Sequence, residues 1–247
     1  MNPSAYLLPL CVEWVILITS LVPLVGWRGG NKRPNIAIFL LFAALGSAIL
    51  AGLAAIVLAA SSVIDLWSTL ATEPVSEREL GGLIPALFAA MAPWALLALA
   101  GITIAIVNLR IEPAIQAARQ LHPRLEAAIK PAADFQRVAT GIVQAPAVLS
   151  FTTRTAGRPT IVLSSRAIEL LTGDELEAVC WHELGHIRGR HNALKLVAQA
   201  LRQVAPRIAA SAVLVARLET LCEIAADNFA TKHVSRQDLL TARAKFD

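Results

Sequence analysis

The segment from His182 to His186 reads His-Glu-Leu-Gly-His, with two histidines four residues apart and a glutamate beside the first. In a helix, four residues make about 1.1 turns, so both imidazoles lie on one face. Two histidine nitrogens from one helix can bind a single Zn²⁺, and Glu183 can then take a proton from a water at that ion. The spacing therefore predicts a metal centre with hydrolytic chemistry. The alternative is a helix with two unrelated surface histidines.

A catalytic zinc usually has three protein ligands and one open position, so a third ligand is required. The downstream candidates are His191, Glu223, Asp227 and His233. Were the helix to continue, His191 would be rotated by about 140° from His186, which indicates a surface or supporting residue. Glu223 and Asp227 are four residues apart in an apolar segment, where buried carboxylates need partners. A metal would satisfy Glu223, and the N–H of a ligand histidine would satisfy Asp227. The alternative is an acidic pair that faces solvent.

Local signals outline the elements that must position these residues. Thr172 is followed three residues later by Glu175, a capping-box pattern that predicts the start of the helix with the two histidines. Upstream, residues 146–153 and 160–165 are short β-branched runs, separated by the turn-like residues 155–158. This pattern predicts a hairpin, which must pack on helices because two strands alone are only marginally stable.

The N-terminal part of the chain has the composition of a membrane domain. The whole chain is 56% hydrophobic and 16% charged, whereas soluble proteins carry about 25% charged residues. A helix needs roughly 20 apolar residues to cross the hydrocarbon core of a bilayer. Residues 6–27, 35–64 and 81–109 meet this requirement. The sequence therefore predicts a three-span membrane domain over residues 1–109. The first span is not expected to be a cleaved signal peptide, because no basic residue precedes it.

The remaining residues have a different character. Residues 1–109 hold four Lys/Arg against five Asp/Glu, whereas residues 110–247 hold eighteen against thirteen. Residues 110–137, interrupted by prolines, are predicted to form an amphipathic juxtamembrane connector, and residues 138–247 a metal-binding domain. Within that domain, residues 192–218 predict amphipathic helices that cover the active site or lie on the membrane. A span there would bury four cations at about 2.5–3.5 kcal/mol each.

The placement of Lys and Arg predicts the orientation in the membrane. The N-terminal tail has none, the loop after the first span has three, and the loop after the second span has one among four acids. Five follow between residues 110 and 137. We therefore expect a multi-pass plasma-membrane protein with its N-terminus outside and its C-terminal half in the cytoplasm. The dispersed basic residues favour contact with lipid headgroups, and no motif indicates direct binding of nucleic acid.

The pattern HExxH followed by Glu-x-x-x-Asp resembles the gluzincin metallopeptidases. Three predicted spans ahead of a zinc domain, with Glu-Ile-Ala-Ala-Asp at 223–227, are most similar to the BlaR/MecR-type antirepressor peptidases. The phrase Leu-Thr-Gly-Asp-Glu-Leu-Glu-Ala-Val before the histidines also resembles the HtpX and CAAX-prenyl-protease branch. The specific resemblance covers residues 146–230, and over the spans it is one of topology only.

This resemblance implies a mainly α membrane protein, in which three transmembrane helices precede a cytosolic α+β gluzincin domain with a small β-sheet. The implied activity is zinc-dependent endopeptidase cleavage of a protein substrate, which is a repressor in the BlaR/MecR branch and a membrane protein in the HtpX branch. A peptide substrate would add to an edge strand formed by residues 160–165. The residues to which the resemblance assigns roles are the zinc ligands His182, His186 and Glu223, the general base Glu183, and Asp227, which would orient a ligand histidine.

Two alternatives stay open from the residues alone. His233 and Arg236 are candidates for stabilising the oxyanion of the reaction, or they are surface residues of a C-terminal helix. The competing function is a non-catalytic membrane receptor or scaffold with a structural zinc. Structural zinc sites are usually closed by four ligands, so Cys180 or Cys222 would have to supply the fourth.

Overall fold

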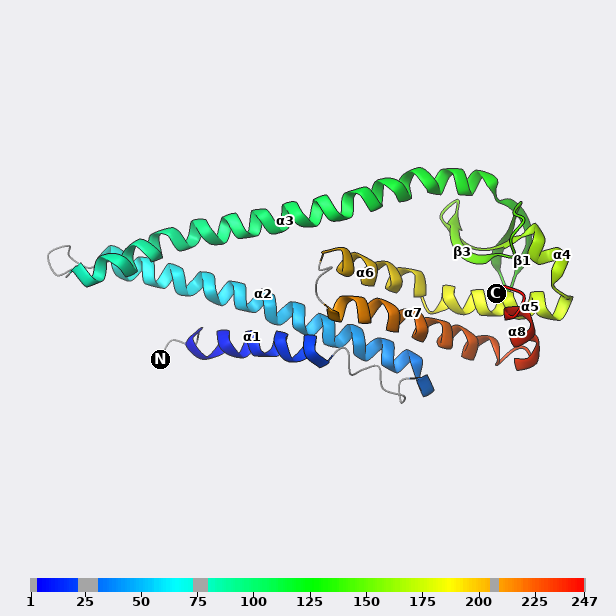
Figure 1. The fold of residues 1–247 in the computed structure, drawn as a ribbon, viewed down its shortest axis with the longest axis horizontal. Coiled ribbons are helices and arrows are strands. Elements are labelled where there is room, and N and C mark those ends of the chain that lie inside the picture. The colour runs from blue at the N-terminus through cyan, green and yellow to red at the C-terminus, as the bar shows by residue number, and fades with distance from the viewer. Residues whose placement is uncertain (1–3, 22–30, 73–79, 205–208, 247) are drawn as a thin grey trace. The chain divides into compact units, whose positions relative to one another are not determined.

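The structure is a computed structural model that describes residues 4–21, 31–72, 80–204 and 209–246 (Figure 1). It is mainly helical with one small mixed sheet, as the sequence predicted. The chain divides into two compact units. One consists of Met1–Val25 with Leu40–Arg110, and the other of Gly26–Phe39 with Ile111–Asp247.

The first unit is built from long apolar helices, each of which contains most of one predicted span. They are α1 (Ser4–Leu21), α2 (Pro34–Thr72) and the first part of α3 (Leu80–Ala128). In the described part of the chain, Pro34–Asp65 is long and apolar enough to cross a membrane, with a mean hydropathy of 2.5. The apolar stretch of α1, Pro9–Ile18, is shorter. The orientation prediction rests partly on residues 22–30 and 73–79, which lie outside the described residues.

Helix α3 differs from the expected broken connector. It continues through Pro113 and Pro123 to Ala128, and the first strand begins at Lys130, inside the predicted connector of residues 110–137. A proline in a helix removes one backbone hydrogen bond and bends the helix. Neither proline ends α3, and the helix stops only two residues before the sheet begins.

The second unit contains a four-stranded sheet. Its strands are β1 (Lys130–Phe135), β2 (Val138–Val143), β3 (Ser150–Thr155) and β4 (Arg158–Ser164), in the spatial order β1-β2-β4-β3. The pair β3–β4 is antiparallel and joined by a two-residue turn, which confirms the predicted hairpin. The pair β1–β2 is a second, unpredicted hairpin, and β2 runs parallel to β4. Strand β4 is therefore central and β3 is an edge, so the prediction that residues 160–165 form the edge strand is wrong.

Helices pack against this sheet and against one another. They are α4 (Ser165–Leu170), α5 (Gly173–Arg188), α6 (His191–Val204), α7 (Ala209–Ala230) and α8 (Arg236–Arg243). A buried cluster joins β4 to α5, α7 and α8; its members include Ile161, Trp181, Leu184, Ala230 and Leu239. The ring of Phe135 on β1 meets Trp181 edge-on with centroids 5.2 Å apart. This core fixes α5, the helix that carries the two histidines, against the sheet.

Candidate metal centre

Helix α5 begins where the sequence predicted. The Thr172 side chain accepts from the Glu175 backbone N–H, and the Glu175 carboxylate accepts from the Thr172 N–H at 2.7 Å, which completes the capping box. Helix α7 packs closely along α5 at Gly185, where an added Cβ would lie 3.0 Å from the Cα of Ala226. The glycine between the two histidines therefore lets α7 bring Glu223 up to the histidine pair.

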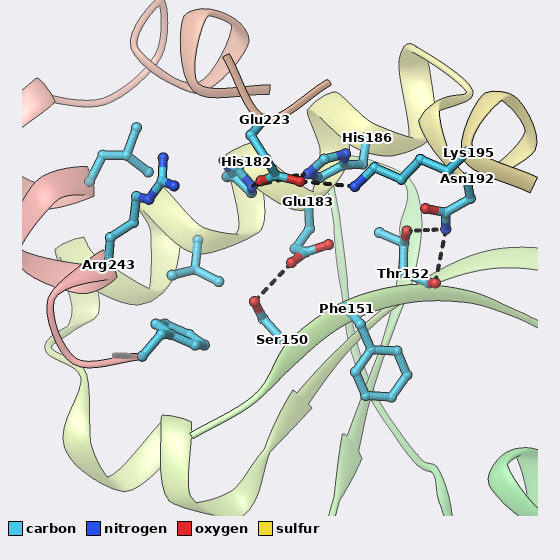
Figure 2. Close-up of a pocket in the computed structure, with 13 residues that line it drawn as sticks. Ser150, Phe151, Thr152, His182, Glu183, His186, Asn192, Lys195, Glu223 and Arg243 are labelled. Carbon is cyan, nitrogen blue, oxygen red and sulfur yellow. Dashed lines mark hydrogen bonds and ion pairs between the residues drawn. The ribbon is translucent and has the colours of Figure 1, made fainter. Parts of the chain in front are cut away.

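Three side chains converge between α5 and α7 (Figure 2). Nε2 of His182 lies 3.1 Å from Nε2 of His186, and Oε2 of Glu223 lies 3.4 Å and 3.5 Å from these two nitrogens. Ligands of a tetrahedral zinc lie about 2.0–2.1 Å from the ion, so they are about 3.3 Å from one another. Both the spacing and the chemistry of these groups therefore fit Zn²⁺.

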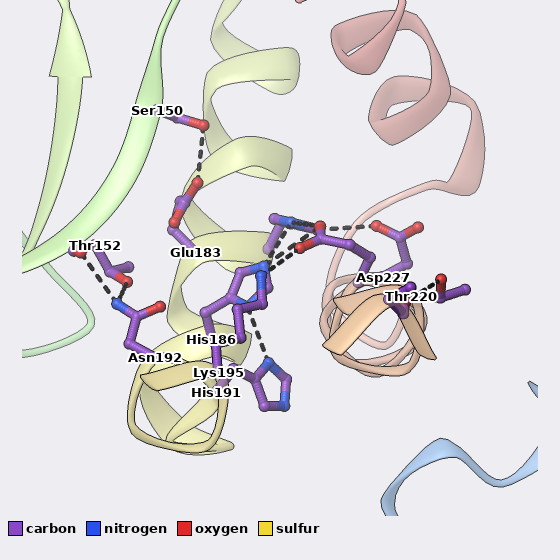
Figure 3. Close-up of polar contacts among 12 residues, drawn as sticks. Ser150, Thr152, Glu183, His186, His191, Asn192, Lys195, Thr220 and Asp227 are labelled. Atoms are coloured by element: carbon purple, nitrogen blue, oxygen red, sulfur yellow. Dashed lines mark hydrogen bonds and ion pairs between the residues drawn. The ribbon is translucent and has the colours of Figure 1, made fainter. Parts of the chain in front are cut away.

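Asp227, which lies one turn after Glu223 on α7, supports His182. Its Oδ1 lies 2.8 Å from Nδ1 of His182, and its Oδ2 accepts from the guanidinium of Arg243 on α8 (Figure 3 shows Asp227 beside the cluster). Burial opposes protonation of His182, but hydrogen bonds with Asp227 and Glu223 outweigh it and raise the pKa of His182 to about 9. A proton donated from Nδ1 to Asp227 leaves Nε2 facing the cluster.

His191 supports the second histidine. Its side chain is buried, with 2% of the residue exposed, and its Nδ1 lies 2.9 Å from Nδ1 of His186. If Nε2 of His186 binds a metal, its Nδ1 carries the proton and donates it to His191. Burial and the neighbouring His186 lower the pKa of His191 to about 4, so it is a neutral acceptor. The sequence predicted either a surface residue or a supporting residue at position 191, and the structure agrees with the second.

Glu183 lies beside the histidines in a pocket of about 370 Å³. Only 6% of this residue is exposed, and its Oε1 accepts from the hydroxyl of Ser150 on β3 at 2.8 Å. The pocket is lined by residues of α5, α6, α7, α8 and β3, which include Thr152, Lys195 and Arg243. The carboxylate is thus fixed next to the metal cluster and open to the same cavity.

Several residues of this pocket were not foreseen from the sequence. Lys195 of α6 donates to Oε1 of Glu223 at 2.9 Å, and Asn192 of α6 donates to the backbone oxygen and the hydroxyl of Thr152 at 3.1 Å and 2.8 Å. Burial raises the pKa of Glu223, but hydrogen bonds from His182, His186 and Lys195 hold it well below its ordinary value. Glu223 therefore carries a negative charge that suits a cation.

The structure does not bring His233 into this pocket. Its exposed ring stacks on Trp181, with centroids 3.7 Å apart and planes 6° apart. Arg236 lines a second pocket, together with Asp227 and Arg243. Among the described residues, Arg243 is the arginine that lines the pocket with the metal cluster. It is therefore better placed than either predicted residue to meet a developing negative charge.

The cysteines do not join the cluster. Cys180 and Cys222 are both buried, and burial raises the pKa of each thiol to about 11. In the described part of the chain, the group of side chains that could hold a metal consists of two histidines and one glutamate. Three ligands beside a cavity are typical of catalytic zinc, whereas a structural zinc is usually closed by four.

A mixed α/β fold with a two-histidine, one-glutamate cluster and an adjacent glutamate defines a protein of the zinc metallopeptidase class. The model of peptidase family M48 matches residues 116–246, more than half of the chain. The chain belongs to this family, whose members are zinc-dependent metallopeptidases. This finding supports the HtpX and CAAX-prenyl-protease branch and not specifically the BlaR/MecR branch, to which the sequence seemed most similar.

Among solved structures, the chain is similar to the crystal structure of S. mikatae Ste24p, with 11% sequence identity and a TM-score of 0.40. The similarity covers 98% of this chain and 91% of that one. No curated protein sequence matches the chain.

Proposed function

We propose that this protein is a membrane-anchored zinc endopeptidase that cleaves peptide bonds of a protein substrate. The observation that carries the proposal is the convergence of His182, His186 and Glu223 at zinc-ligand spacing, with Glu183 beside them in one pocket. A zinc ion held by these ligands would supply Lewis-acid chemistry, making water more acidic and polarising a carbonyl. Membership of family M48 supports the same reaction class.

Glu183 would act as the general base. Its carboxylate accepts the proton of the attacking water and then passes it to the leaving amine. The hydroxyl of Ser150 holds one carboxylate oxygen, which fixes the direction of the other. Arg243 would contribute positive charge near the oxyanion, while its contact with Asp227 holds its guanidinium at the pocket wall.

The substrate would bind as an extended strand along β3. The Ser164 N–H donates to the Leu149 carbonyl at 2.9 Å, so residues 149, 151, 153 and 155 direct their backbone groups towards β4. The backbone groups of Ser150, Thr152 and Arg154 therefore point to the side of the edge strand that faces away from β4, where the Thr152 backbone oxygen also accepts from Asn192. Main-chain hydrogen bonds to such an edge are a common way to bind peptides. Ser150 and Thr152 also line the metal pocket, so a strand bound here passes the cluster.

The membrane anchor is proposed to consist of three spans, over residues 6–27, 35–64 and 81–109. Helix α2 supports this, because large apolar side chains such as Leu50, Val57 and Ile64 are each about two-thirds exposed. An exposed apolar face of this length is suited to lipid and unfavourable in water. The N-terminus would then lie outside the plasma membrane and the peptidase unit in the cytoplasm.

Substitution of Glu183 with Gln tests the activity. The amide cannot accept the proton, so cleavage of a peptide substrate should fall by about 10²–10⁴-fold while one zinc per chain is retained. Zinc content and cleavage rate are measured on the same preparation. An E183Q protein that cleaves at the wild-type rate would show that the base is another group.

The same variant can identify the substrate. Proteins that accumulate uncut in cells with E183Q, but not with the wild type, are candidate substrates. A transcriptional repressor, which the BlaR/MecR resemblance implies, and a membrane protein, which the HtpX branch implies, are told apart by this comparison.

A further inference from the structure

Helix α6 contributes a cation to the metal cluster although it carries none of the three ligands. Lys195 lies one turn after His191, and its side chain extends across to Glu223 (Figure 2). The distance from Nζ to Oε1 of Glu223 is 2.9 Å, and 24% of the Lys195 side chain is exposed. The pair therefore lies at the wall of the pocket and is partly shielded from water.

The two oxygens of Glu223 have different neighbours. Oε2 faces both imidazoles at 3.4 Å and 3.5 Å, whereas Oε1 faces the ammonium group of Lys195. A carboxylate can bind a metal through one oxygen or through both. A second bound oxygen would take up coordination space that a catalytic zinc keeps for water and substrate.

We propose that Lys195 is a positioning residue that holds Oε1 of Glu223 away from the metal and so makes Glu223 a one-oxygen ligand. The proposal rests on the zinc centre described above and adds the control of its coordination number. Hydrogen bonds from outer residues to ligands are known to tune metal sites, and their loss typically weakens metal binding by about 10–100-fold. A charge-assisted hydrogen bond is a strong restraint on the carboxylate.

The competing explanation is an ordinary ion pair that helps α6 pack on α7. Partly exposed pairs of this kind contribute little to stability and nothing to metal binding. The chain contains a matched control, because Lys245 donates to Oε2 of Glu175 at 2.6 Å. That pair also joins a lysine to a glutamate of the peptidase unit, but Glu175 belongs to the capping box of α5 and not to the metal cluster.

The test compares K195M, K195R and K245M with the full wild-type chain. Zinc affinity is measured by competition with a chelator, coordination by the visible absorption of the Co²⁺-loaded proteins, and stability by Tm. K195M should bind zinc about 10–100-fold more weakly. Its Co²⁺ bands should also be weaker than those of the wild type, as expected for a higher coordination number. K195R, which can still donate to Oε1, should lie between K195M and the wild type.

K245M should change Tm only slightly and keep wild-type zinc affinity and the wild-type Co²⁺ spectrum. If K195M behaves like K245M, then Lys195 forms only an ion pair and the proposal is wrong, although the zinc centre stands. If K195R binds zinc more weakly than K195M, the proposal that a cation at position 195 restrains Oε1 is also wrong. If the wild type binds neither metal, the proposed function fails, and the role of Lys195 fails with it.

Discussion

The two histidines of the metal cluster are supported by partners of different kinds, one a carboxylate and the other an imidazole. Asp227 is an anion that accepts from Nδ1 of His182, whereas His191 is a neutral ring that can accept from Nδ1 of His186. Both partners leave Nε2 directed at the cluster. Since the pKa of His182 is raised to about 9 in the metal-free site, a metal must displace a proton there at neutral pH.

Substitution of Asp227 with Asn tests this support at the residue scale. The change removes the anion that orients His182, so zinc affinity should fall by about 10–100-fold even though competition from the proton is relieved. The measurement is zinc competition with a chelator at neutral pH. E219Q is the matched control, because Glu219 is exposed on the same helix and the charge change is equal. Equal zinc affinities for D227N and E219Q would show that Asp227 does not orient a ligand.

Helical spacing was sufficient to predict some of the site residues. His182 with His186, and Glu223 with Asp227, are four residues apart, so each pair shares one helix face whatever the rest of the fold does. The partners that complete the site could not be predicted in this way. Ser150 and Arg243 reach the pocket from a strand and a C-terminal helix, and their positions depend on packing between elements that no local pattern describes.

At the scale of elements, the end of α5 explains why the position of His191 was hard to predict. The rotation argument assumed that the helix continues, but α5 ends at Arg188 with Gly189 as its C-cap, and Arg190 has a φ of 52°. The chain therefore turns and brings His191 back behind His186. A Cβ at position 189 would overlap the His191 ring, so the glycine leaves room for that ring behind His186.

The turns of the two hairpins differ in whether the sequence signals them. Ala156 and Gly157 have φ of 49° and 76°, and a glycine in such a turn is a signal that sequence reasoning can use. Gln136 and Arg137 adopt φ of 49° and 67° with no glycine or asparagine. The first hairpin therefore carried no turn signal, and its strand β1 was assigned to the connector.

Substitution of Thr152 with Pro tests the edge strand. Proline removes a backbone N–H that points away from β4, so the sheet should be retained while one substrate hydrogen bond is lost. An unmade hydrogen bond costs about 1–3 kcal/mol, which corresponds to a fall in kcat/KM of about 5–150-fold. The assay is cleavage of an extended peptide, with Tm measured alongside.

T152V is the control for this experiment, because it loses the same hydroxyl, and with it one of the two hydrogen bonds from Asn192, but keeps the N–H. Cleavage by T152P at the rate of T152V would mean that the substrate does not pair with β3.

At the scale of the whole molecule, the change in composition coincides with one boundary between the two units. That boundary falls between Arg110 and Ile111, within α3, and the family M48 match lies entirely in the second unit. The apolar first unit and the metal site of the second could be outlined from composition and spacing. The length of α3 could not, because its prolines suggested breaks that the helix does not make.

Reporter fusions test the proposed membrane orientation. An alkaline phosphatase fused between residues 73 and 79 should be active, because that loop is predicted to lie outside, whereas one fused after Asp247 should be inactive. A fluorescent protein after Asp247 should fold and fluoresce in the cytoplasm. The opposite pattern would place the peptidase unit outside the cell and overturn the orientation inferred from the positive-inside rule.

The central claim is that one zinc ion is bound by His182, His186 and Glu223. Anomalous diffraction at the zinc edge, from crystals of the zinc-loaded chain, tests it directly. The account predicts a single strong peak about 2.0–2.2 Å from Nε2 of each histidine and from one oxygen of Glu223, with Glu183 beside it and not bound. A peak within bonding distance of the sulfur of Cys180 or Cys222, or the absence of a peak between α5 and α7, would contradict this claim.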